Sequence, residues 1–144
     1  MSEDGSLGQT GLVERQPPEP KPRGASDDEA IALCREWMIY LGAVDTVVAS
    51  GAAVQACDLY SASYLAWVDN ERGNLDVSHV TKAASVCAAD GRLGLIFVRH
   101  GVIPQAVDRA DELGVAIFGF DPQGGTLDGG NLLGRELCVT GLAR

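Results

Sequence analysis

The side chains best suited to chemistry in this sequence are two carboxylates and a lysine. Asp58 and Asp69 lie within the stretch CDLYSASYLAWVDN, residues 57–70, and Lys82 follows soon after. Carboxylate oxygens are ligands that Mg²⁺ prefers, and a bound divalent metal ion activates water and stabilises charge on a phosphate. Asp58 also has a second interpretation, as a carboxylate at a strand edge that accepts a hydrogen bond from a nearby amide. Which interpretation holds depends on the elements that position these residues.

A helix is predicted ahead of the candidate residues. Ser26 and Glu29 have the spacing of a capping box, with acidic residues in the first turn. Apolar residues then recur every three or four positions from Ile31 to Leu41, and Gly42 ends the pattern. This segment is therefore expected to be a helix with one apolar face.

The candidate residues themselves fall in a region of period two. Short strands are predicted over 46–49, 56–61 and 64–69, with a turn between the last two. The polar loop ERGN, residues 71–74, separates them from a second helix over 76–90. Asp58 and Asp69 are thus expected on neighbouring strands, and Lys82 on the helix that follows.

The remaining elements alternate between strand and helix. LGLIFV, residues 93–98, is a continuous apolar run typical of a strand covered on both faces. A helix over 103–113, a strand over 115–120 and a short helix over 129–137 complete the order. A meander followed by crossovers predicts an α/β fold: a mixed sheet of about five strands, antiparallel on one side and parallel on the other, sandwiched by helices.

Length and charge restrict the class of protein. The 144 residues fit one domain, and 46% hydrophobic residues can fill one core. The net charge is -9, and residues 27–144 alone carry eight Lys and Arg against sixteen Asp and Glu, or -8. Such a surface repels a phosphate backbone, so protein partners are expected ahead of DNA. The oligomeric state stays open.

The N-terminus has the composition of a disordered tail. Residues 1–26 include QPPEPKPRG and few apolar side chains, so order is expected to begin at Ser26, with one domain over 27–144. No signal peptide or membrane-spanning segment is recognisable, which predicts a cytoplasmic protein. The cysteines are widely spaced and are expected to be buried small hydrophobes rather than zinc ligands: Cys34, Cys57, Cys87 and Cys138.

In several phrases the chain resembles restriction-endonuclease-like domains of the Mrr type, in their actinobacterial form. The resemblance runs from about Asp28 to Leu137, and the order of elements matches as well. The matching phrases are EWMIYLGA (36–43), DLYSASYLAWVDN (58–70), VSHVTKAASVCAA (77–89), GLIFV (94–98), GVIPQAVDRADELGVAIFGFD (101–121) and GTLDGGNLLGREL (125–137).

This resemblance implies a magnesium-dependent nuclease site in which two of three reactive groups are exchanged. The family places an Asp on the second strand, and an acid or Gln followed by a Lys at alternate positions of the third, facing one cleft. Here Asp58 keeps the first position, Trp67 takes that of the acid or Gln, and Asp69 takes that of the Lys. VQAC, residues 54–57, also replaces the glycine-rich approach of the family. The resemblance therefore implies a decayed site that needs no cofactor.

Two interpretations remain open for the altered cleft. Trp67 is either a packing residue or, if exposed, part of a partner surface. In some nucleases of this broad fold the lysine lies on the following helix, so Asp58, Asp69 and Glu71 could supply oxygens to Mg²⁺ with Lys82 as the displaced cation. That arrangement would make the chain an active endodeoxyribonuclease.

The first function hypothesis is nevertheless an interaction module that binds a protein or, weakly, DNA. A third hypothesis is a self-assembling protein whose apolar helix faces pair with another chain.

Two further expectations concern the basic residues and histidines. A basic patch could form only if several cations converge: Lys82, Arg92, Arg99 and Arg109. The two histidines, His79 and His100, are expected at solvated positions.

Overall fold

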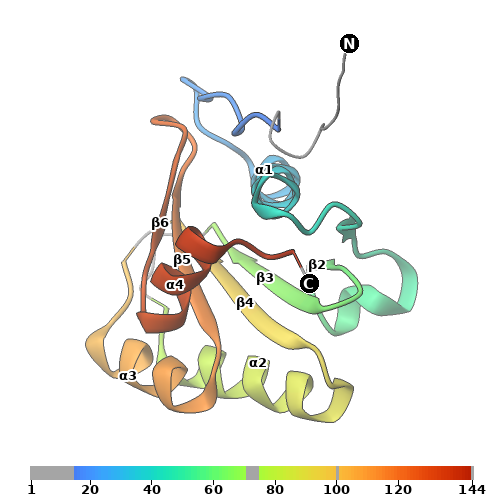
Figure 1. The fold of residues 1–144 in the computed structure, drawn as a ribbon, viewed down its shortest axis with the longest axis vertical. Helices are drawn as coiled ribbons and strands as arrows, with labels where there is room; N and C mark the ends of the chain where they lie inside the picture. Colours follow the sequence, from blue (N-terminus) through green and yellow to red (C-terminus); the bar gives the residue numbers. More distant parts are fainter. Residues whose placement is uncertain (1–14, 71–74, 100, 144) are drawn as a thin grey trace.

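The computed structural model describes residues 15–70, 75–99 and 101–143 (Figure 1). The predicted loop over 71–74 and His100 lie outside these residues, as does most of the predicted tail. The helices are α1 (Asp27–Leu41), α2 (Val77–Asp90), α3 (Pro104–Leu113) and α4 (Leu132–Thr140), with a short 3₁₀ helix, η1 (Gly51–Gln55). The strands are β1 (Val47–Val48), β2 (Leu59–Tyr60), β3 (Tyr64–Asp69), β4 (Leu93–Val98), β5 (Ala116–Asp121) and β6 (Thr126–Gly129).

The strands form one mixed sheet in the order of the sequence. β1, β2 and β3 pair antiparallel, β3, β4 and β5 pair parallel, and β6 returns antiparallel to β5. The predicted α/β fold, with a mixed sheet flanked by helices, is confirmed. Its sixth strand was not predicted, because no side chain of TLDG is buried and the segment lacks an apolar alternation.

The helices cover the two faces of the sheet in pairs (Figure 1). α2 and α3 connect successive parallel strands and lie side by side on one face, as crossovers of one hand require. α1 and α4 lie on the other face. β4 is buried between the layers, which confirms the expectation from its continuous apolar run.

Alternating side chains of the strands supply the two core layers. Toward α1 and α4, Phe97 and Phe118 stack with ring centroids 5.1 Å apart. Toward α2 and α3, Ile96 and Ile117 pack with the buried Val80 of α2. Both sheet faces thus bury apolar area, which stabilises the fold at roughly 25 cal/mol per Å².

Local signals explain where the site-bearing helices begin. Ser26 and Glu29 form the predicted capping box: the Ser26 hydroxyl accepts from the Glu29 amide, and the Ser26 amide donates to the Glu29 carboxylate. Asp76 caps α2 by accepting from the amide of His79. No described helix is long and apolar enough to cross a membrane.

The chain contacts the folded part earlier than the composition suggests. Among residues 15–25, which the sequence assigns to the tail, the Arg15 Nε donates to the carbonyl oxygen of Tyr40 at 3.2 Å. The Lys21 amide donates to the carbonyl oxygen of Pro122 at 2.7 Å. Hydrogen bonds thus connect residues before Ser26 to α1 and to the turn between β5 and β6.

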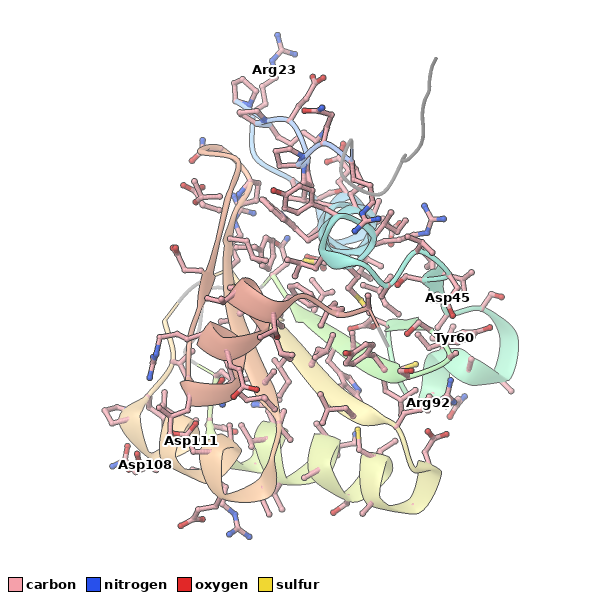
Figure 2. The ribbon with its side chains drawn as sticks, viewed as in Figure 1. Arg23, Asp45, Tyr60, Arg92, Asp108 and Asp111 are labelled. Atoms are coloured by element: carbon pink, nitrogen blue, oxygen red, sulfur yellow. The ribbon has the colours of Figure 1, made fainter. Side chains whose placement is uncertain are left out.

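A buried asparagine holds α4 on the sheet. Asn131 is fully buried, and its Oδ1 accepts from the amides of Ile117 and Gly134, both at 2.9 Å. Its Nδ2 donates to the carbonyl oxygen of Val115 at 2.7 Å. The next amide, that of Leu132, donates to Asp111 of α3, which Figure 2 labels. These bonds set the start of α4 after Asn131, whereas the sequence predicts a start at 129.

Replacing Asn131 by alanine should be strongly destabilising. The substitution leaves two amides and one carbonyl without their partner in a buried setting, and a buried group left unpaired costs about 1–3 kcal/mol. We expect a loss at the upper end of that range in urea denaturation. Leu132→Ala is the control, because Leu132 is 64% exposed. Equal losses in the two variants would contradict this role of Asn131.

Candidate functional site

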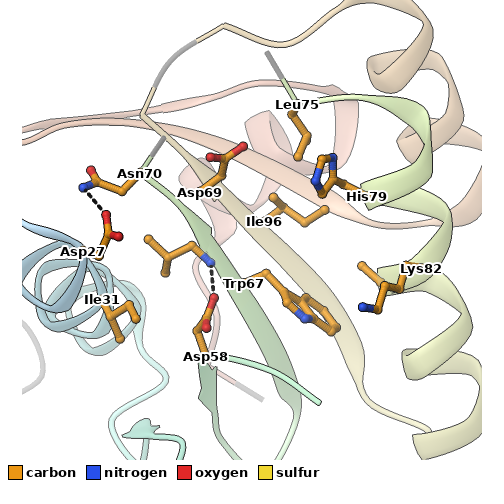
Figure 3. A pocket seen from close by; sticks show the side chains of 12 residues that line it. Asp27, Ile31, Asp58, Trp67, Asp69, Asn70, Leu75, His79, Lys82 and Ile96 are labelled. Carbon is orange, nitrogen blue, oxygen red and sulfur yellow. Dashed lines mark hydrogen bonds between the residues drawn. The ribbon is translucent and has the colours of Figure 1, made fainter. Parts of the chain in front are cut away.

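The site begins where β2 stops pairing with β3. The register pairs Tyr60 with Leu65 and Leu59 with Ala66, and the Asp58 amide donates to the Ala66 carbonyl at 2.9 Å. Beyond this pair, β2 offers no backbone partner to the next amide on this edge of β3, that of Val68. The Asp58 carboxylate takes that place and accepts from the Val68 amide at 2.8 Å (Figure 3). Asp58 is therefore the strand-edge acceptor that the sequence suggested.

The alternation of β3 directs its candidate side chains toward α2. Tyr64 and Ala66 belong to the core beneath α1 and α4, whereas Leu65 and Trp67 pack on the opposite side. Asp69 has the same parity as Trp67. The period of two predicted from the sequence thus places positions 67 and 69 on the same face.

A cavity of about 550 Å³ brings the four predicted site residues together. Asp58, Trp67, Asp69 and Lys82 all line it. Figure 3 shows the Trp67 indole between Asp58 and Lys82, with Ile96 beside it. The volume lies within the range of about 300–1,000 Å³ that ligand sites occupy.

Trp67 is a packing residue that also lines this cavity. Its side chain is half-buried and contacts two groups of core residues beneath α2, one containing Ile96 and the other Leu65. Of the two interpretations left open, packing is therefore confirmed, and part of the indole still reaches the surface of the cleft. An indole offers one N–H donor and no oxygen, so it cannot serve as a carboxylate would.

The Asp58 carboxyl group is held in an environment that disfavours its charge. Burial raises its pKa above the ordinary value, while the hydrogen bond from the Val68 amide acts in the opposite direction. Asp58 forms no ion pair with any of the described residues. Lys82, on α2, is exposed. The cleft thus presents an uncompensated carboxylate.

Three further cavity residues were not recognised in the sequence. From the sequence, Asp27 indicates only an acidic first turn of a helix. Asn70 only ends one of the phrases that carry the resemblance. In the structure the side-chain Nδ2 of Asn70 donates to Asp27 Oδ1 at 3.0 Å (Figure 3). His79 is exposed, as expected, but it also lines the cavity. No sequence signal connects positions 27 and 70.

The basic patch does not assemble around the cavity in the described part of the chain. Of the four cations considered, Lys82 alone lines it. Arg92 pairs with Asp90 at 2.6 Å and lies over the ring of Tyr60, next to which Figure 2 labels it. Arg99 donates to the Ala25 carbonyl and to Asn70, and Arg109 pairs with Glu112. Among the described residues, these three arginines thus pair elsewhere and do not line the cavity with Lys82.

The donor set does not fit the magnesium site that the resemblance implies. Among the described residues, no three His, Cys, Asp or Glu side chains are grouped so that they could hold a metal ion. Trp67 stands where the resemblance implies an acid or Gln, and an indole offers no oxygen. Glu71, which could add a carboxylate, lies outside the described residues.

Compared with known proteins, the chain matches no family model, no curated protein and no solved structure. The resemblance to the Mrr type therefore stays a prediction that depends on the quoted phrases.

Replacing Asp58 by asparagine or by alanine separates its two roles. Asparagine keeps an acceptor for the Val68 amide and removes the charge, whereas alanine removes both. We expect the alanine variant to be less stable than the asparagine variant by about 1 kcal/mol, the usual net value of one hydrogen bond. Urea denaturation at neutral pH measures this difference, and equal stability would contradict the bond.

The pH dependence of the Asp58→Asn effect has a defined sign. Because the pKa of Asp58 is raised in the folded state, its favourable contribution is present below the ordinary value of 3.8 and is lost as the pH rises through the raised pKa. The asparagine variant should therefore gain stability relative to the original chain near neutral pH. That gain should disappear toward pH 3.8 and below. A gain that grows on acidification would exclude burial as the dominant influence.

Proposed function

We propose that this chain is a non-hydrolytic binding domain of the restriction-endonuclease-like type, whose former active cleft receives a protein partner. The topology supports the assignment, since a helix, a three-stranded meander, a crossover helix and a parallel strand occur in the order that the resemblance implies. The proposal places the protein in the cytoplasm. Its four cysteines are free, and three of them are buried, as expected of small hydrophobes there.

The observation that carries the proposal is the position of Trp67. The indole occupies the middle of the cleft, between the retained Asp58 and the cation Lys82 (Figure 3). A metal-dependent nuclease needs an oxygen ligand and a hydrated ion in that part of the cleft. An aromatic side chain there instead adds an apolar contact surface, and tryptophan is enriched among the residues that dominate protein interfaces.

The charge of the chain favours a protein over DNA as the partner. The net charge is -9, and three carboxylates face the same cavity. DNA binding draws its affinity mainly from cations that neutralise phosphates, and among the described residues the cavity offers only Lys82 and, when protonated, His79.

An active nuclease with a rearranged site is the second candidate. It is favoured by one observation, that Asp58, Asp69 and Lys82 do line the same cavity. In this arrangement Asp58 and Asp69 would supply oxygens and Lys82 the cation. The proposal ranks it second because Trp67 stands among these three residues.

Self-assembly through apolar helix faces receives less support. The apolar residues of α1 and α2 pack on the sheet of the same chain, including Met38 and Val80. Among the described residues, large exposed apolar side chains lie instead near β1 and on α4: Val44, Val47, Val48, Val54, Leu132 and Val139, with Leu113 at the end of α3. The apolar faces of α1 and α2 are therefore covered within the chain, and only single apolar side chains of the other described helices are exposed.

Hydrolysis is tested by incubating the purified chain with supercoiled plasmid and Mg²⁺ or Mn²⁺. We expect no more nicked or linear DNA than with Asp58→Asn, a variant that keeps the hydrogen bond to Val68. Metal-dependent cleavage that both Asp58→Asn and Lys82→Met abolish would overturn the proposal and establish the rearranged nuclease.

Binding to DNA is tested separately by a mobility shift with a labelled duplex. We expect any complex formed in low salt to be lost at about 0.15 M salt, because the few cation–phosphate contacts are replaced by counterions. Lys82→Met should weaken the low-salt complex. Retention of the duplex at the higher salt concentration would favour DNA as the physiological ligand.

A further inference from the structure

Among the residues that the structure describes, three carboxylates from different parts of the chain line the cavity. Asp27 is in the first turn of α1, Asp58 immediately precedes β2 and Asp69 ends β3. They are far apart in the sequence, so their convergence is a property of the fold. The acidic balance of the whole chain, -9, favours the approach of a cationic group.

The two basic side chains of the cavity both belong to α2. His79 Nδ1 lies 2.8 Å from Oδ1 of Asp76, so a proton on this ring is matched by a carboxylate of its own helix. Lys82 is exposed, and Figure 3 shows it on the far side of the indole from Asp58. The two basic side chains thus lie along one wall, and neither forms an ion pair with Asp58.

An incoming cation would give Asp58 the ion pair that it does not form with any described residue. Its side chain is half-buried, lines the cavity and forms no ion pair with a described residue. Its Oδ2 accepts from the Val68 amide at 2.8 Å. A carboxylate can accept several hydrogen bonds, so this bond leaves capacity for a second donor.

The rest of the cavity wall suits a flat, weakly hydrated cation. Trp67 contributes an indole next to Asp58, and Ile31 and Ile96 add apolar surface. Cations bind over indole rings, most often as guanidinium groups, and the interaction strengthens when water is excluded. A guanidinium group also donates two parallel hydrogen bonds to one carboxylate, which an ammonium group cannot do.

We propose that the cleft receives the guanidinium group of an arginine on a partner protein, with Asp58 as its carboxylate and Trp67 as its aromatic contact. This inference rests on the proposed function and names the partner chemistry of the same cleft. Asp27 lines the same cavity near the C-terminal end of β3, where it accepts from the Asn70 side chain. Because the whole chain carries -9, a basic partner surface would be attracted before the arginine enters.

The test is a titration of the isotope-labelled full chain with a glycine-serine peptide that contains one central arginine. The NMR signal of the Trp67 indole N–H reports entry into the cleft. A matched peptide with citrulline has nearly the same shape without the charge. We expect the arginine peptide to shift the Trp67 signal and to bind at least about tenfold more tightly than the citrulline peptide.

Variants of the chain show whether the peptide uses the proposed residues. Asp58→Asn keeps the bond to Val68 and should weaken arginine binding about fivefold or more, a loss typical of a charge-assisted hydrogen bond. Asp108→Asn is the matched control, because Asp108 is exposed on α3 and does not line the cavity (Figure 2). It should bind the peptide as the original chain does.

Several outcomes would overturn the inference. These are equal binding of the arginine and citrulline peptides, no binding of either, or equal losses in Asp58→Asn and Asp108→Asn. Tighter binding of free spermidine than of the arginine peptide would assign the cleft to small polyamines instead of a protein. None of these results produces DNA cleavage, so the failure of this inference is distinguishable from the failure of the proposed function.

Discussion

The short length of β2 is the constraint from which the site follows, because β2 does not begin until Leu59, after Asp58. β3 has six residues and β2 has two, so part of one edge of β3 has no neighbouring strand. An unpaired amide at such an edge is costly unless a side chain or water satisfies it. Asp58 meets this requirement at Val68, and in doing so it is held at the wall of the cavity. The residue that completes the sheet is therefore also the residue that gives the cleft its charge.

The same cavity would serve hydrolysis or recognition according to one side chain in its middle. Asp69 of β3, Asp58 just before β2 and Lys82 of α2 all line it. Trp67 changes what they can do, because its ring excludes space and offers no oxygen, while it contributes packing beneath α2. Trp67 thus adds apolar surface to the cleft and contributes to the packing beneath α2.

The other wall of the cleft depends on contacts between remote parts of the chain. Asn70, one residue past β3, donates to Asp27 of α1 and to the Ala25 carbonyl. Arg99, just past β4, donates to the same carbonyl and to the side-chain oxygen of Asn70. These bonds attach the segment before α1 to the ends of two central strands.

The sequence by itself determined the layered α/β fold, since its helix caps, its period-two strands and the apolar run of β4 are local signals. It also identified the four residues that meet in the cleft. It did not predict β6, whose side chains are not buried, or the true start of α4, which a buried Asn131 sets through bonds to β5. The convergence of Asp27 with Asp58 and Asp69 was decided only by tertiary structure. Local patterns report the period of a segment, whereas the distance between remote segments depends on how the layers pack.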